Sequence, residues 1–67
     1  MILKRLRDLR EDNDLSQEEL AKHLNLTQRA YSYYETGERN VPIEVLMKLA
    51  KFYHTTIDYL TNQTDKK

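Results

Sequence analysis

Sixty-seven residues with eleven basic and eleven acidic side chains, one glycine, one proline and no cysteine suffice for one small globular domain and leave no room for a second. The absence of cysteine excludes disulfides, thiolate metal sites and cysteine nucleophiles, and it agrees with a reducing, cytoplasmic location. No apolar run exceeds the three residues of Val45-Leu46-Met47, which excludes a membrane span of roughly twenty residues, and the zero formal charge argues against indiscriminate binding of polyanions.

Apolar residues at helical spacing predict an all-α chain of five short helices. The first helix is expected over about residues 2–12, with an apolar stripe made of Leu3, Leu6 and Leu9. Ser16 followed by Glu19 is a capping box, in which the hydroxyl accepts from the amide of Glu19 and the carboxylate accepts from the amide of Ser16. The second helix is therefore expected to start at about residue 17.

Turn and cap residues predict the remaining boundaries. Asn25, a residue type that tolerates left-handed backbone, follows the second helix. Thr27 is the expected N-cap of a third helix, which ends before Gly37. Pro42 begins a fourth helix and Thr56 caps a short fifth one. The apolar residues of these last two helices are Val45, Leu46, Leu49, Ala50, Tyr53, Ile57, Tyr59 and Leu60.

The second and third helices, separated by about three residues, have the dimensions of a helix-turn-helix over residues 16–36. In such a pair the second helix enters the DNA major groove. A rotation of about 100° per residue gathers the hydrogen-bonding side chains of the third helix on one outer face. That face holds Gln28, Arg29, Ser32 and Tyr33. Because Gln can pair with adenine and Arg with guanine through two hydrogen bonds, these residues are expected to contact base edges.

The opposite face of the third helix is expected to pack inward. It carries Tyr31 and Tyr34, and it has small Ala30 where the second helix, with its own Ala21, must come close. An ordinary amphipathic helix with a solvated face would show the same outer residues. The capping box, the short turn and the small Ala21 favour the alternative, a helix pair whose second N-terminus projects outward.

Four segments occur together at fixed separations: Leu15-Ser16-Gln17-Glu18-Glu19-Leu20-Ala21, Tyr34-Glu35-Thr36-Gly37, Leu46-Met47-Lys48-Leu49-Ala50 and Ile57-Asp58-Tyr59-Leu60. In this combination the chain resembles the Cro and phage-repressor type of helix-turn-helix family, also called XRE, over residues 3–61. The resemblance implies a compact, five-helix, lambda-repressor-like fold that binds operator DNA as a homodimer and regulates transcription, typically as a repressor. Residues 1–61 would be the DNA-binding domain and 62–67 a polar C-terminal tail.

The resemblance also implies roles for individual positions. Base-facing positions of the family are matched by Gln28, Arg29, Ser32 and Tyr33. Positions that contact backbone phosphates are matched by Gln17, Thr27, Thr36, Arg39 and Asn40. Arg10 and Glu35 match an ion pair that ties the first helix to the recognition helix.

Three positions depart from the family pattern. Asp14 and Asn25 stand where glycine is common, and Tyr31 stands where a branched aliphatic residue is usual. The tyrosine ring can fill the core only if its hydroxyl finds water, a phosphate or a buried partner.

No catalytic, metal or cofactor site is expected. His23 and His54 lack a neighbouring cluster of acidic residues or histidines at metal-ligand spacing. The two serines are accounted for as a helix cap and a groove-facing residue, and a single glycine cannot build a phosphate-binding loop. The chain is therefore expected to be no enzyme and to need no small-molecule ligand.

Two other functions stay open on this fold: an antitoxin and a protein-interaction module that has lost DNA binding. The tail after Leu60 is short and polar for a toxin-binding segment, and positions 28, 29, 32 and 33 lack the acidic or bulky apolar residues that lost DNA binding predicts. Under the favoured hypothesis of DNA binding, a homodimer binds a palindrome. Its contact is expected near the C-terminal helix, because Ile57, Tyr59 and Leu60 offer more apolar surface than so short a helix can bury.

Overall fold

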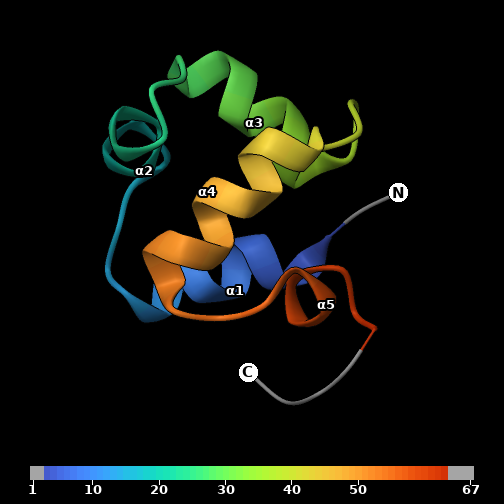
Figure 1. Ribbon diagram of the computed structural model, residues 1–67. Helices are drawn as coiled ribbons and strands as arrows, with labels where there is room; N and C mark the ends of the chain where they lie inside the picture. Colours follow the sequence, from blue (N-terminus) through green and yellow to red (C-terminus); the bar gives the residue numbers. More distant parts are fainter. Residues whose placement is uncertain (1–2, 64–67) are drawn as a thin grey trace.

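The computed structural model describes residues 3–63, which contain five helices and no strand (Figure 1). The helices are α1 (Lys4–Asp12), α2 (Gln17–His23), α3 (Gln28–Thr36), α4 (Ile43–Tyr53) and α5 (Ile57–Leu60). The all-α, five-helix prediction is therefore confirmed. The first helix starts at Lys4 rather than at about residue 2, with Leu3 as its N-cap. Residues 64–67 of the predicted tail lie outside the described residues.

The five helices share one apolar core. In Figure 1, α4 crosses the middle of the molecule, with α3 on one side and α1 and α5 on the other. α2 packs against α3, α3 against α1, and α5 against α4. Helices of these lengths are not stable alone in water, so packing must hold them. Every helix contributes to the core, whose buried members are Leu3, Leu6, Leu9, Leu20, Ala21, Leu24, Tyr31, Val45, Leu46, Leu49 and Leu60.

Side-chain caps start three of the helices. At α2 the capping box is complete: Ser16 Oγ accepts from the Glu19 amide at 3.0 Å, and Glu19 Oε1 accepts from the Ser16 amide at 3.1 Å. Thr27 Oγ1 accepts from the amide of Ala30 at 3.1 Å and caps α3, and Thr56 caps α5 in the same way. α4 begins directly after Pro42, which makes no side-chain cap.

Several turns between the helices contain a residue with left-handed backbone conformation. Gly37 follows α3 with φ of 81°, and Asp14 and Asn25 have φ of 56° and 61°. Asp and Asn are among the few non-glycine residues that adopt this conformation readily, which explains why both can stand where glycine is common. In the turn after α2, the amide of Leu26 donates to Ala21 O at 2.9 Å, which sets the direction in which α3 leaves.

The two predicted packing roles are met in part. Ala30 is half-buried and borders a hollow beside Arg29 and Tyr33, whereas Ala21 lies inside the core and is 1% exposed. Of the three apolar residues expected to offer surface at α5, Leu60 is fully buried where α5 packs on α4, whereas Ile57 and Tyr59 are only partly buried. The large apolar side chains that are exposed within residues 3–63 lie on α4 instead: Ile43 and Met47.

None of the described helices is long and apolar enough to cross a bilayer. Over the same described range, no three acidic or histidine side chains gather in a way that could hold a metal ion.

Replacing Ser16 with Ala removes the acceptor for the Glu19 amide and should lower the free energy of unfolding by about 1 kcal/mol. Ser16→Asn is the matched control, because asparagine caps helices about as well as serine. Urea unfolding followed by circular dichroism measures both variants. Equal stability of the Ala and Asn variants would contradict a role for this cap.

Candidate nucleic-acid interface

α3 turns one face to the core and the other to solvent. Tyr31 is fully buried and Tyr34 packs against the core, whereas Gln28 and Arg29 are exposed at the start of the helix. Ser32 and Tyr33, one turn further along, are partly exposed. The sequence-predicted base-facing residues therefore form an accessible strip that starts at the N-terminus of α3. This outer strip consists of Gln28, Arg29, Ser32 and Tyr33.

An ion pair joins α3 to α1 behind this strip. Arg10 Nε lies 2.6 Å from Glu35 Oε2, and Arg10 Nη2 donates to Glu35 Oε1 at 3.2 Å. The Arg10 and Glu35 side chains are 13% and 5% exposed. Arg10 Nη1 also donates to the carbonyl of Leu15, in the connection to α2, at 2.7 Å. One guanidinium group thus fixes three segments of the chain.

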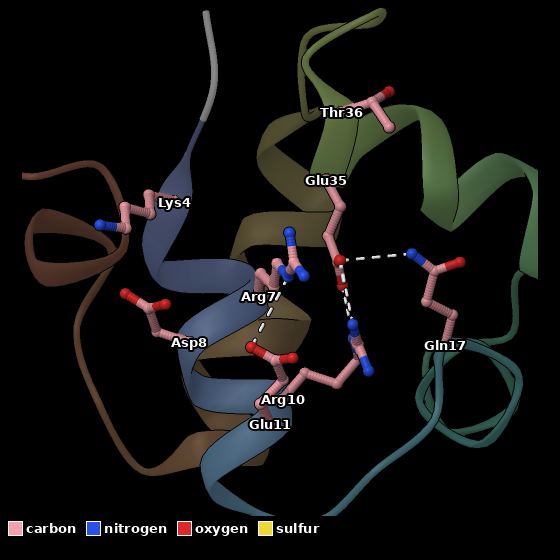
Figure 2. A pocket seen from close by; sticks show the side chains of 8 residues that line it. All are labelled: Lys4, Arg7, Asp8, Arg10, Glu11, Gln17, Glu35 and Thr36. Carbon is pink, nitrogen blue, oxygen red and sulfur yellow. Dashed lines mark hydrogen bonds and ion pairs between the residues drawn. The ribbon is translucent and has the colours of Figure 1, made fainter.

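Gln17 extends this ion pair to the outer strip. Figure 2 shows Arg10, Gln17 and Glu35 pointing toward one another from α1, α2 and α3. Gln17 Nε2 donates to Glu35 Oε1 at 3.2 Å, and Gln17 Oε1 accepts from Gln28 Nε2 at 3.3 Å. A continuous chain of hydrogen bonds therefore runs from α1 to the first residue of α3.

The surroundings of Glu35 stabilise the ionised form of its carboxyl group. Burial by itself raises the pKa of Glu35, but the interactions with Arg10, Tyr31 and Gln17 together outweigh burial, and the pKa falls below its ordinary value. The bond to Glu35 likewise raises the pKa of Arg10. Both groups are charged at neutral pH, so each charge is compensated by the opposite charge of the other group.

Tyr31 lies beside this ion pair. Burial, followed by the Glu35 carboxylate, raises the pKa of Tyr31 far above its ordinary value. The buried Tyr31 hydroxyl meets no hydrogen-bond partner of good geometry among the described residues, and neither does that of Tyr53, whose pKa burial raises to about 12. The ring of Tyr31 thus fills the core beside the Glu35 carboxylate although its hydroxyl lacks the well-aligned partner that the sequence led us to expect, and this hydroxyl stays neutral.

A second cluster lies on the outer side of α3. Arg29 Nε donates to Tyr33 Oη at 3.1 Å, and the guanidinium carbon of Arg39 lies 4.5 Å from the centroid of the Tyr33 ring. Arg39 belongs to the loop after α3, and its amide donates to Tyr33 O at 3.3 Å. With Thr27 and Ala30, these three residues border a hollow of about 310 Å³.

The other sequence-predicted phosphate contacts are dispersed. Thr27 caps α3 with its side chain. Thr36 Oγ1 lies 3.2 Å from Glu38 Oε1 and 3.3 Å from Tyr33 O, which engages the hydroxyl within the protein. Asn40 is exposed in the loop between α3 and α4. The structure therefore brings the side chains of Arg29, Tyr33 and Arg39 together, whereas the Thr36 hydroxyl is hydrogen-bonded to Glu38 and to the backbone of Tyr33, and Asn40 is exposed in the loop.

Arg10 is the one residue of α1 that the sequence assigned to the candidate site. A groove of about 550 Å³ between α1 and α3 has further charged residues on its walls (Figure 2). Its lining includes Lys4, Arg7, Asp8 and Glu11. Arg7 and Glu11 pair at 3.6 Å, and their spacing of four residues on a helix could have predicted that pair. The groove mixes both signs of charge, so it does not concentrate positive potential.

Comparison with known proteins gives one consistent result. A family model described as Helix-turn-helix matches residues 6–60. The chain is 34% identical to the uncharacterized HTH-type transcriptional regulator YobD of Bacillus subtilis and 37% identical to the cryptic phage CTXphi transcriptional repressor RstR of Vibrio cholerae. Each match covers 97% of this chain, which spans 58% and 59% of the length of those two proteins.

A solved structure agrees with these sequence matches. The P22 c2 repressor, crystallised in complex with a synthetic operator, superimposes with a TM-score of 0.85 and 26% sequence identity. The superposition covers 96% of this chain and 98% of the repressor chain. The five-helix fold is thus that of a phage repressor.

Replacing Arg10 with Met should leave the Glu35 carboxylate buried without its cation and cost about 3 kcal/mol of stability at pH 7. Because the pKa of Glu35 is lowered in the folded chain, its contribution to wild-type stability is present above the ordinary carboxyl pKa and is lost as the pH falls through the folded value. The deficit of the variant should therefore shrink between pH 7 and pH 3. Urea unfolding at both pH values measures it.

Arg7→Met is the matched control for this experiment. Arg7 is on the same helix, and its pair with Glu11 is largely exposed, so its replacement should change stability little at either pH. Equal losses from the two replacements would show that the Arg10 pair has no special weight.

Proposed function

The chain belongs to the helix-turn-helix family, and on this basis we propose that it is a transcriptional regulator, a repressor, that binds double-stranded operator DNA with α3 in the major groove. The names of RstR and of the P22 c2 repressor support this reading, since both are repressors and the second was solved with an operator. The proposal includes action in the cytoplasm. No catalytic role is part of the proposal.

The observation that carries the proposal is the outer strip of α3, whose first two residues carry base-reading side chains. Gln28 is aligned from behind by Gln17, and Arg29 is aligned from the side by Tyr33. In a major groove, Gln28 would pair with an adenine and Arg29 with a guanine. Ser32 and Tyr33 would face the groove one turn further along.

The remaining residues would hold the backbone of the duplex. Arg39 and Asn40 in the loop after α3, together with Thr36, would contact phosphates at one end of the strip. Gln17 and Thr27 would do so at the N-terminal ends of α2 and α3, where backbone amides favour anions. Such contacts fix the register of the protein on the duplex without reading its sequence.

A homodimer at a palindrome completes the proposal. One recognition helix spans only a few base pairs, and a chain with zero formal charge adds little general attraction for DNA. Two copies related by a two-fold axis double the number of bases that are read. Assembly could be weak in solution and be completed on the operator by mass action.

In-vitro selection of bound sequences from random duplexes tests the proposed function. A symmetric enriched motif is the expected result, because two copies of α3 would read two identical half-sites. Failure of the chain to enrich any duplex at low salt would overturn the proposal and favour an antitoxin or a protein-interaction module.

Arg29→Ala and Arg39→Ala should weaken binding in different ways. Loss of Arg29 should cost about 1 to 3 kcal/mol on the selected duplex and relax one position in each half-site. Loss of Arg39 should weaken all duplexes alike and reduce the slope of log K against log salt by about one. Titrations on the selected duplex and on its single-base variants, at several salt concentrations, separate the two effects. Interchanged behaviour would contradict the assignment.

Half-site centres should lie roughly 34 to 36 Å apart, so that both recognition helices meet the same face of the duplex. Inserting about five base pairs between the half-sites places them on opposite faces and should abolish tight binding. Affinity that survives the insertion, or one chain per operator in sedimentation of the complex, would rule out the dimer.

A further inference from the structure

Tyr33 is the one residue of the outer strip that contacts two arginines from two segments of the chain. Its hydroxyl accepts from Arg29 Nε, and its ring lies 4.5 Å from the guanidinium carbon of Arg39. We propose, on the basis of the proposed DNA-binding function, that Tyr33 is a positioning residue that holds both arginines ready for DNA. In this role it sets sequence specificity through Arg29 and does not itself read a base.

Both contacts leave the arginines able to bind DNA. A guanidinium group has five N–H donors, and the hydrogen bond to Tyr33 uses only the one on Arg29 Nε. The four donors on Nη1 and Nη2 are those that can pair with the two acceptor atoms of guanine. Arg39 contacts the ring of Tyr33 through a cation–π interaction, which is not a hydrogen bond to the Tyr33 hydroxyl and so leaves guanidinium donors for a phosphate.

The contacts also reduce what binding costs. Arg29 and Arg39 are exposed, and exposed arginines sample many rotamers that they must give up on a duplex. A tyrosine that is half-buried in α3 offers both of them a fixed support. No carboxylate lines this hollow among the described residues, so the two charges form a local positive patch on a chain with zero formal charge.

The same geometry argues against direct reading by Tyr33. Its hydroxyl already accepts a hydrogen bond, and one face of its ring is covered by Arg39. For the base contact that the sequence suggests, Tyr33 has left only the proton of its hydroxyl and the uncovered face of its ring. As a positioning residue, Tyr33 keeps both arginine contacts.

Tyr33→Phe separates the two halves of the proposal, because it removes the hydroxyl and keeps the ring. Affinity for the selected duplex should fall roughly two- to tenfold, which corresponds to the usual net contribution of one hydrogen bond. The loss should be confined to discrimination at the base pair that Arg29 reads, with the salt slope unchanged. Thermal unfolding of the variant serves as the check on folding.

A double-mutant cycle with Arg29→Ala decides whether Tyr33 acts through Arg29. If it does, Tyr33→Phe has no further effect once Arg29 is alanine. Additive losses would show that the Tyr33 hydroxyl contacts DNA itself, and they would overturn the proposal.

Tyr33→Leu, compared with Tyr33→Phe, tests the support of Arg39, because both variants lack the hydroxyl and only leucine lacks the ring. Relative to Tyr33→Phe, binding of Tyr33→Leu to all duplexes should weaken alike, roughly two- to fivefold, as expected for an exposed cation–π contact. This difference should disappear in the Arg39→Ala background. A difference that persists there would overturn the role of the ring.

A measurement without DNA keeps this inference separate from the proposed function. In the free protein, 15N relaxation should show the Nε group of Arg29 to be ordered in the wild type and mobile in Tyr33→Phe. Equal mobility in both would overturn the positioning role even if the wild type binds DNA. If the Nε group is ordered as expected but no duplex is bound, the proposed function fails instead, and the inference drawn from it falls with it.

Discussion

The arrangement of α3 depends on one charged interaction, the ion pair between Arg10 and Glu35. A carboxylate that is 5% exposed is costly to bury unless it is paired and hydrogen-bonded. Here it accepts from Arg10 and from Gln17, while the guanidinium group also donates to the carbonyl of Leu15. The cost of burial is therefore offset only when α1, the connection to α2 and α3 are all in place.

A buried ion pair is weak evidence for a large net gain in stability, but it is well suited to fixing the register of packed elements. The apolar core can be filled by several related packings, whereas a bidentate arginine and carboxylate accept few. In this protein the rotation of α3 about its own axis matters most, because that rotation decides which side chains face solvent as the outer strip. Gln17 carries this constraint to Gln28, at the surface.

The outer strip is held from two sides, and this suits a chain with equal numbers of acidic and basic residues. Without an excess of positive charge, affinity for DNA must come from a few well-placed groups. Gln28 is held by the polar network behind it, and Arg29 by Tyr33 beside it. Preorganised side chains lose less freedom on binding, so fewer contacts are needed for a given affinity.

The sequence by itself determined what depends on one helical turn or one backbone conformation. The capping box at Ser16, the cap at Thr27 and the left-handed Asn25 follow from local hydrogen bonding and sterics, and periodicity placed Tyr31 inside and Arg29 outside. Only the tertiary structure decided the contacts between distant segments: Gln17 between Glu35 and Gln28, Arg39 on the ring of Tyr33, and Leu60 buried against α4. These depend on the angles at which helices cross and on the path of a loop, and no local pattern encodes either, because both arise from packing the whole core at once.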